Sequence, residues 1–234
     1  MSSAVPSRRP MDPAVIVARE KENVLVGDEI VRHRLYSRII HWTVAVTFFV
    51  NVFTGMPIWT PLFGWMGQLF GGLTVCRVIH PWAGVAFFIS SVFMFFDWVA
   101  DMHLEKHEKK GWWGPGLIRY LRWEVEDVDT GKYNGGQKFF FWTVGLGALG
   151  LLLSGLIIWF PRAFPALLTE FSFVIHDLAF ILFTVAVVFH IYLGTSAEPG
   201  TFRSMTRGTV TRKWARLHHP RWFREVTGEE ARRP

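Results

Sequence analysis

Cysteine is nearly absent from this chain, because its 234 residues include only Cys76. A single thiol excludes an internal disulfide, an iron–sulfur cluster held by four thiolates, and the Cys-x-x-Cys-His attachment of a c-type haem. Nine histidines remain as the candidate metal ligands. Any metal centre in this protein must therefore rest on histidine.

Charge is missing from the interior of the long apolar segments, in which no Lys or Arg lies near the middle. Half of the residues are hydrophobic, and they gather into blocks. Crossing a hydrocarbon core of about 30 Å takes about 20 largely apolar residues. Lipid offers no hydrogen bonds to a bare backbone, so each such segment is predicted to be a helix. The sequence predicts an all-α integral membrane protein with a four-transmembrane-helix bundle, whose spans are about 39–58, 80–100, 139–160 and 172–194.

The stretch before Ile39 lacks a long apolar run, so it does not resemble a cleaved secretory signal. Orientation follows from the basic residues, which are in excess on cytoplasmic segments. Of the 25 Lys and Arg, 23 lie in the terminal segments and the loop between spans two and three, and only Arg77 and Arg162 lie in the other two loops. Both termini and the loop over about 101–138 are predicted to be cytoplasmic.

The two ends of the chain are expected to lie outside the membrane domain, which spans 32–207. Residues 1–31 are rich in Pro, Ser and Arg, which is typical of a poorly ordered cytoplasmic extension. Residues 208–234 form a basic tail, expected either to lie on anionic lipid or to be disordered. The pI near 9.8 does not indicate a nucleic-acid partner, because the basic residues lie beside the ends of the spans, where the rule for membrane orientation already accounts for them.

Four histidines lie within or at the edge of the predicted spans: His41, His80, His176 and His190. The last two share one span and are fourteen residues apart, which returns the side chain to within about 40° of the same helix face after about 21 Å. Given the topology, only two pairings place both partners at one depth. His41 pairs with His190 on the cytoplasmic side, and His80 pairs with His176 on the outer side.

Each pair joins two different helices and leaves a slot that a flat macrocycle fits, with one imidazole on each face of its iron. Two b-type haems stacked across the bilayer are therefore the hypothesis, with an inner haem on His41 and His190 and an outer haem on His80 and His176. The alternative for each histidine is a simple hydrogen bond to a neighbouring helix. Polar groups inside a membrane are costly enough to suggest function. The other histidines lie in charged segments and are expected to be solvated: His33, His103, His107, His218 and His219.

Small and basic residues near the spans admit two interpretations each. The third span has no histidine but carries glycines that would admit either a porphyrin or a closely packed helix, namely Gly145, Gly147, Gly150 and Gly155. Arg38 and Arg77 each precede a histidine by three residues. They are candidates to pair with haem propionates, or else to anchor the topology.

Several segments together resemble one known family. They are RIIHW around His41, RVIHPWAGV around His80, the loop GKYNGGQKFFFW, the fourth-span segment VIHDLAFILFTVAVVFHIYLG, and EPGTF after it. The chain resembles the cytochrome b (gamma) subunit of membrane-bound respiratory formate dehydrogenase over residues 32–207. The fourteen-residue histidine spacing also occurs in cytochromes b of nickel–iron hydrogenases, so a hydrogenase or another quinone-linked dehydrogenase remains the alternative.

The resemblance implies an electron-transfer subunit of a bacterial inner-membrane complex. A molybdenum or tungsten catalytic (alpha) subunit would oxidise formate, and an iron–sulfur (beta) subunit would pass electrons through two haem b groups to menaquinone or ubiquinone at the cytoplasmic side. Asn134 and Gln137 would help form the quinone site near His190. The chain would be a quinone-reducing subunit that does not itself oxidise formate, and a trimer of heterotrimers is suggested.

The alternative from a different class of protein is a transporter or a haem-free membrane anchor. A transporter would favour internal repeats, broken helices or charges at mid-membrane, and the sequence shows no convincing repeat. A mere anchor has no need of paired histidines.

Overall fold

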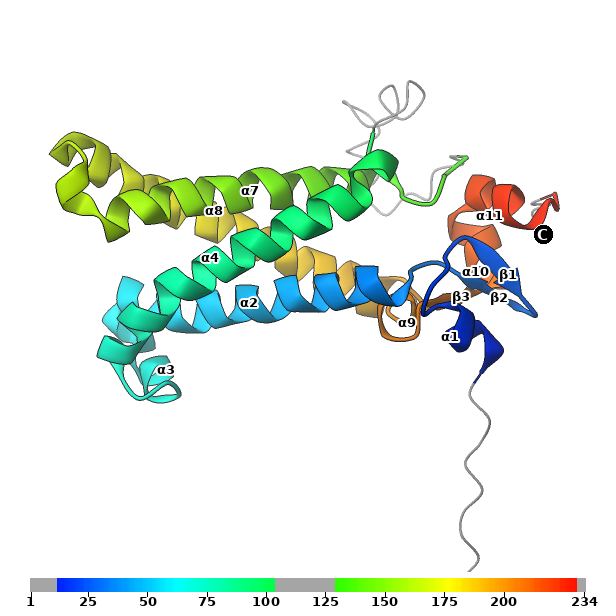
Figure 1. The fold of residues 1–234 in the computed structure, drawn as a ribbon, viewed down its shortest axis with the longest axis horizontal. Helices are drawn as coiled ribbons and strands as arrows, with labels where there is room; N and C mark the ends of the chain where they lie inside the picture. The colour runs from blue at the N-terminus through cyan, green and yellow to red at the C-terminus, as the bar shows by residue number, and fades with distance from the viewer. Residues whose placement is uncertain (1–11, 104–128, 231–234) are drawn as a thin grey trace, which may run out of the picture.

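The computed structural model describes residues 12–103 and 129–230 of the chain. Within these residues, four helices are long and apolar enough to cross a membrane (Figure 1). The predicted four-helix membrane bundle is therefore confirmed. The four helices are α2 (Leu35–Trp59), α4 (Leu73–Trp98), α7 (Gly135–Trp159) and α8 (Ala166–Tyr192).

The helices begin several residues before the apolar segments that predicted them. Helix α4 begins at Leu73 and α8 at Ala166, whereas the apolar segments were placed from 80 and 172. Hydropathy marks only the part of a helix inside the hydrocarbon, and the backbone continues its hydrogen bonding into the interface. Polar residues such as Arg77 and Lys138 consequently lie within helices.

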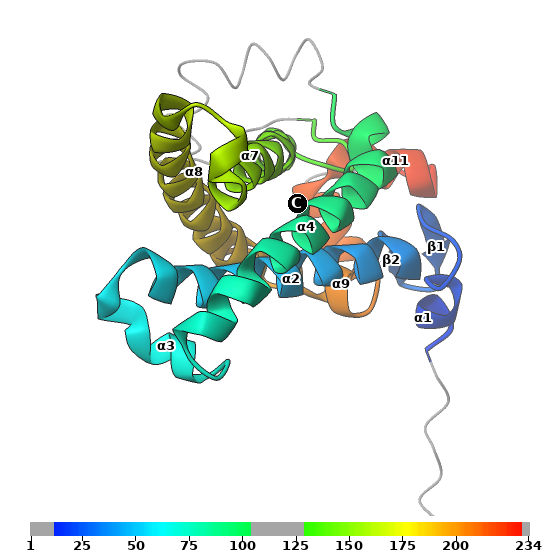
Figure 2. The same ribbon diagram turned by 60° about the vertical axis from the view of Figure 1, so that its left-hand side comes forward.

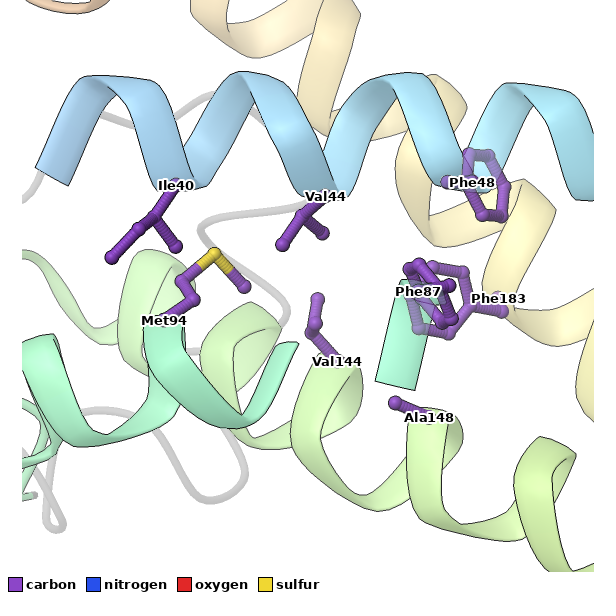
Figure 3. Close-up of a cluster of buried hydrophobic side chains, with 8 residues drawn as sticks. All are labelled: Ile40, Val44, Phe48, Phe87, Met94, Val144, Ala148 and Phe183. Carbon is purple, nitrogen blue, oxygen red and sulfur yellow. The ribbon is translucent and has the colours of Figure 1, made fainter. Parts of the chain in front are cut away.

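The four helices are arranged as two hairpins. Helix α2 packs along α4, α7 packs along α8, and the hairpins meet where α4 packs along α7 (Figures 1 and 2). Helices α2 and α8 are both fully described and are not a closely packed pair. A core cluster from all four helices joins the hairpins (Figure 3), comprising Ile40, Val44, Phe48, Phe87, Met94, Val144, Ala148 and Phe183.

One end of the bundle holds the two connections within the hairpins, and we call it the loop end. The α2–α4 connection contains η1 (Pro61–Phe63) and α3 (Gly64–Gln68), and the α7–α8 connection contains η3 (Pro161–Ala163). Before α4 the chain turns through Gly71 and Gly72, whose φ angles of +91° and +107° favour glycine. At the opposite end, α4 continues into η2 (Val99–Asp101) and α8 into a π-helical turn, η4 (Leu193–Ala197).

The opposite end of the bundle carries a small domain built from both ends of the chain, and we call it the domain end (Figure 1). The N-terminal part supplies α1 (Pro13–Val17), β1 (Val24–Val26) and β2 (Glu29–Val31). These two strands pair antiparallel with a third, β3 (Thr209–Thr211), in the order β1-β2-β3, with Ile30 opposite Val210. The C-terminal part supplies α9 (Arg203–Thr206), β3 (Thr209–Thr211), α10 (Arg212–His218) and α11 (Pro220–Thr227).

This small domain differs from the expectation of a poorly ordered extension and tail. Residues 12–31 and 208–230 pack around a shared core of Ile30, Val210, Trp214, Ala215, Trp222 and Phe223. An ion pair between Glu29 and Arg203 also joins the two parts. Each part alone offers too few apolar residues to bury, so composition suggested disorder. Together they bury two tryptophans and a phenylalanine, and large aromatic side chains contribute strongly to burial.

Candidate haem sites

The structure brings the four membrane histidines together as two pairs. At the domain end, the rings of His41 and His190 have their centroids 6.1 Å apart. At the loop end, the rings of His80 and His176 have their centroids 6.2 Å apart. We call these the domain-end pair and the loop-end pair. In each pair one ring comes from the α2–α4 hairpin and the other from the α7–α8 hairpin.

Both ring separations match the space that one metal ion between two imidazoles requires. A bond from a metal ion to a histidine nitrogen is about 2 Å long, and the ring centre lies roughly 1 Å beyond the nitrogen, so two axial imidazoles have centroids about 6 Å apart. In residues 12–103 and 129–230 no group of three or more His, Cys, Asp or Glu could hold a metal ion. A porphyrin supplies four equatorial nitrogens itself, so two protein ligands suffice for haem iron.

The loop-end pair has its ring orientation fixed by two hydroxyl groups. Thr54 Oγ1 lies 3.2 Å from His80 Nδ1, and Ser154 Oγ lies 2.9 Å from His176 Nδ1. Both hydroxyls donate their single proton to a carbonyl one turn earlier, Thr54 to Val50 at 2.6 Å and Ser154 to Gly150 at 2.7 Å. Each Nδ1 must therefore donate to the hydroxyl oxygen, which leaves the Nε2 lone pair free to bind a metal ion.

Each of these hydroxyl residues is followed by a glycine that lies against the same histidine. A Cβ atom at Gly55 would come within 2.8 Å of His80 Cε1, and one at Gly155 within 3.3 Å of His176 Cε1. At Gly55 the ring and the helix backbone therefore approach more closely than a Cβ atom allows, and at Gly155 the approach is tight. Gly147, in turn, admits the ring of Phe183, whereas Gly150 has no neighbour within 4 Å among the described atoms.

The loop-end pair lines a cavity of about 400 Å³. Its walls come from all four helices and are mostly apolar. The polar lining residues beside the histidines are Asn51 and Asp177. Trp59 also lines this cavity, and its Nε1 donates a hydrogen bond to Asp177 Oδ2 at 3.2 Å.

The domain-end pair lines a second cavity, of about 360 Å³. The ring of His190 stacks on Phe140, with centroids 4.4 Å apart and an angle of 5° between the planes. His41 Nδ1 is buried and has no hydrogen-bond partner among the described residues. The domain-end histidines are therefore positioned by aromatic packing, whereas the loop-end histidines are positioned by hydroxyl groups.

Three phenylalanines that Figure 3 labels, Phe48, Phe87 and Phe183, lie where the two cavities adjoin. Phe48 and Phe87 line both cavities, and Phe183 lies 5.2 Å from Phe48 and 5.7 Å from Phe87 by ring centroids. These side chains belong to the buried core that joins the hairpins. The two cavities thus lie in line along the bundle, on either side of an aromatic layer.

The wall of the domain-end cavity nearest the small domain is polar. Arg32, His33, Tyr133 and Gln137 line it, and several of their nitrogen and oxygen atoms are buried without a partner. Arg32 is 2% exposed, and burial lowers its pKa to about 10, so it stays charged at neutral pH. Burial, with the nearby charge of Arg32, holds the pKa of His33 well below its usual value, so His33 is neutral. This wall offers hydrogen-bond donors to an acceptor oxygen.

Asn134 and Gln137 form the start of helix α7. Asn134 Oδ1 accepts a hydrogen bond from the backbone N–H of Gln137, and Gln137 Oε1 accepts one from that of Asn134, at 2.9 and 3.0 Å. This reciprocal arrangement is a capping box. Gln137 also lies 3.5 Å from Arg32 Nη2 and lines the domain-end cavity, whereas Asn134 is not among the described residues that line it.

The expectation that the remaining histidines are solvated is wrong for two of them. His33 is 2% exposed and His219 is 1% exposed. His219 Nδ1 donates to the Gly131 carbonyl at 2.7 Å, and its ring packs on Trp214. His103 is exposed as expected, His218 is half-buried, and His107 lies outside the described residues. Charged neighbours in the sequence suggested solvent, but the ring of His33 packs against Trp98 and Tyr133, and the ring of His219 is buried within the small domain.

Two arginines were candidates to pair with haem propionates. Arg38 is buried, and its Nη1 donates to the Thr206 carbonyl at 2.9 Å, which ties α2 to the small domain. Arg77 is exposed at the loop end. Sequence reasoning missed Arg32, which lies at the cavity wall but precedes the first apolar run by several residues.

Sequence reasoning also missed the hydroxyl–glycine dipeptides. The segments TGMPIW (54–59) and SGLIIW (154–159) are similar in sequence and lie near the loop ends of α2 and α7. In each, the hydroxyl and the glycine contact the histidine of the following long helix. This short repeat was the signal that could have identified them.

Four membrane helices, two facing histidine pairs and a cavity around each pair define a membrane protein of the cytochrome b class. Comparison with known proteins gives the family. The sequence model described as prokaryotic cytochrome b561 matches residues 32–208, so this chain belongs to that family. It is accordingly a haem-binding electron-transfer protein of the membrane.

The chain is also similar to formate dehydrogenase subunits. It is 36% identical to the nitrate-inducible cytochrome b556(Fdn) subunit of formate dehydrogenase from Escherichia coli K12, over 87% of this chain and 94% of that protein. It is 36% identical to the cytochrome b556 subunit from Haemophilus influenzae, over 84% and 83%, and to the cytochrome b556(fdo) subunit from Escherichia coli K12, over 85% and 94%. The resemblance read from the sequence motifs is confirmed.

Proposed function

We propose that this chain is the cytochrome b subunit of a membrane-bound formate dehydrogenase, and that it carries electrons to a quinone through two b haems. The observation that carries the proposal is the pair of histidine sites, each with rings about 6 Å apart beside its own cavity. His41 and His190 would hold one haem iron, and His80 and His176 the other. When bound, the haems would supply two one-electron carriers in line across the bilayer.

The side chains around the histidines fit haem in several respects. The glycines beside His80 and His176 leave room for rings held close to the helix backbone, and the walls of both cavities are mostly apolar. Apolar walls suit a macrocycle, and the unpartnered donors of Arg32 and Tyr133 suit an acidic or carbonyl oxygen at the polar edge. These features support two b haems.

The distribution of basic residues supports an orientation with the domain end in the cytoplasm. The small domain then lies inside the cell, and the loop end faces the opposite compartment. In a bacterium this is the inner membrane, with an iron–sulfur subunit docked near the loop end. A molybdenum or tungsten subunit would release two electrons from each formate.

We place the quinone site at the polar wall of the domain-end cavity. Reduction of a quinone to a quinol takes two electrons and two protons, and at this end the protons would come from the cytoplasm. Arg32 and Gln137 line the wall and can donate hydrogen bonds to a quinone carbonyl. Asn134 acts in this arrangement through Gln137, because its side-chain oxygen caps helix α7. Menaquinone and ubiquinone both present such carbonyls.

The variant His190→Ala tests the assignment in the purified complex. It is expected to lose the domain-end haem and quinone reduction, while the loop-end haem is still reduced by formate. The matched control is His218→Ala, which removes a half-buried histidine of the small domain that lines neither cavity. It should keep both haems. Retention of both haems in His190→Ala would contradict the assignment.

The electron donor is tested by what co-purifies with the chain in mild detergent. A formate dehydrogenase complex should yield an iron–sulfur subunit and a molybdenum or tungsten subunit, and formate should reduce both haems. If the chain instead co-purified with a nickel–iron hydrogenase and its haems were reduced by hydrogen and not by formate, the electron donor would be a hydrogenase. The assignment of the haem sites would not change. The mass of the intact complex would show whether three heterotrimers associate.

A further inference from the structure

Thr54 and Ser154 are the hydroxyl residues of the loop-end site, and the structure gives them equivalent positions. Each lies near the loop end of the first helix of a hairpin, and each contacts the Nδ1 atom of a histidine on the second helix. Each also donates its proton to its own helix backbone. The hydroxyl has no second proton to donate to the ring, so its oxygen accepts a hydrogen bond from the histidine Nδ1–H. The ring is thereby held in the tautomer that carries its proton on Nδ1 and leaves Nε2 without one.

The domain-end site is built differently. His41 Nδ1 has no hydrogen-bond partner among the described residues, and His190 is held by the face of Phe140. Stacking on Phe140 orients the ring of His190, but the Phe140 ring does not accept a hydrogen bond from the N–H of His190, which points along the plane of the imidazole. Both sites therefore offer two histidine ligands, but only the loop-end histidines are held by hydrogen bonds from Nδ1 to a hydroxyl oxygen.

A hydrogen bond from Nδ1–H to an oxygen makes the opposite ring nitrogen a stronger donor to a metal ion. Stronger donation stabilises ferric over ferrous iron, and hydrogen bonding around the ligands is one of the means by which a protein sets a haem potential. Two such hydrogen bonds act on the loop-end site. The closest hydroxyl contact is also short, at 2.9 Å between Ser154 Oγ and His176 Nδ1.

We propose that Thr54 and Ser154 are positioning residues that fix the tautomer of His80 and His176 and thereby hold the loop-end haem at a lower reduction potential than the domain-end haem. This inference rests on the proposed function, because it assumes a haem at each histidine pair. The difference in potential favours electron flow from the loop end to the domain end, where the polar wall lies. The hydroxyl pair would therefore set the direction of electron transfer as well as ligand geometry.

The test is a redox titration of both haems in the purified complex, followed in the visible bands, with haem content measured by pyridine extraction. Thr54→Val and Ser154→Ala should each raise the potential of the lower-potential haem, and the double variant should raise it further. The expected change is on the order of tenfold in the ferric-to-ferrous ratio at a fixed potential, or about 59 mV for a one-electron couple. The other haem should stay near its original potential.

Matched controls use two hydroxyl residues of the α2–α4 hairpin that have no hydrogen bond to a histidine. Thr47 Oγ1 donates to the Thr43 carbonyl at 2.8 Å, and Ser91 Oγ donates to the Phe87 carbonyl at 2.7 Å. Thr47→Val and Ser91→Ala should leave both potentials unchanged. The conservative variants Thr54→Ser and Ser154→Thr keep the hydroxyl oxygen, so they should retain the original potentials even if the apolar variants bind haem poorly.

Three results would overturn the inference. Unchanged potentials in Thr54→Val and Ser154→Ala with both haems bound would refute it while leaving the haem assignment intact. An equal shift of both haems would also refute it, as would a shift in the hydroxyl-retaining variants as large as that in the apolar ones. A separate variant, His80→Ala, tests the assignment of the loop-end haem itself. If that assignment is wrong, His80→Ala keeps both haems.

Discussion

The closest approach of a helix backbone to a candidate ligand occurs at Gly55, and it gives a sharp prediction. A Cβ atom there would lie 2.8 Å from His80 Cε1, whereas ordinary contacts begin near 3.4 Å. In Gly55→Ala the ring must therefore move by roughly 0.6 Å, which exceeds the tolerance of about 0.5 Å for a functional ligand geometry. At Gly155 the corresponding distance to His176 is 3.3 Å, so the ring needs to move by no more than a few tenths of an ångström, which stays within that tolerance.

The assay compares three alanine variants in the purified complex. Gly55→Ala is expected to lose or perturb the loop-end haem, and Gly155→Ala to keep it with a small spectral change. Gly150→Ala is the control, because its added Cβ meets no described atom within 4 Å. Replacing Gly by Ala inside a helix is favourable by about 0.5–1 kcal/mol when nothing clashes. The control should therefore match or exceed the wild-type melting temperature and keep both haems.

The measurements are the haem-to-protein ratio and the reduced-minus-oxidised spectrum. The predicted order of perturbation is Gly55→Ala first, Gly155→Ala second and Gly150→Ala last. Full haem content with a wild-type spectrum in Gly55→Ala would refute the claim that this glycine makes room for His80. Equal losses in all three variants would indicate general destabilisation of the helices, and would refute it as well.

Three further changes probe the cap, the small domain and the core. Asn134→Ala should lower stability by about 1 kcal/mol through loss of the α7 cap, and Asn134→Asp should restore it, as measured by thermal unfolding. His33 and His219 have folded pKa values well below the ordinary 6.5, so the unfolded state binds more protons below that pH. Their stabilisation is present above about pH 6.5 and falls as the pH drops, by about 1.4 kcal/mol per unit for each histidine. His219→Gln should flatten this slope in denaturant titrations followed by tryptophan fluorescence, and an unchanged slope would remove His219 as a cause. Gly147→Ala places a Cβ 2.7 Å from Phe183 and should cost about 1–3 kcal/mol by overpacking, whereas an unaltered melting temperature would show that the ring moves freely.

The membrane part of this fold was predictable because the bilayer imposes simple rules. Span length and the absence of charge located the four helices, and the distribution of Lys and Arg indicated their direction. Once the direction of each helix was set, His41 could meet only His190, and His80 only His176, at the same depth. The observed ring separations agree with those pairings.

The small domain was not predictable in the same way. Its strands β2 and β3 pair Ile30 with Val210, and three-residue strands carry almost no periodic signal. His33 and His219 are buried by contacts with residues distant in the sequence, which periodicity does not reveal, so they were missed as well. Asn134 and Gln137 also form a capping box, whose three-residue spacing before an apolar run was a usable signal, but the family resemblance placed the two residues only in the quinone site.

The most direct test of the central claim is the protohaem content of the purified chain, prepared under haem-replete conditions and measured by pyridine extraction. Two haems per chain are predicted for the natural sequence, and one each for His41→Ala and His80→Ala. A folded preparation without protohaem, or one in which neither substitution removes a haem, would contradict the account.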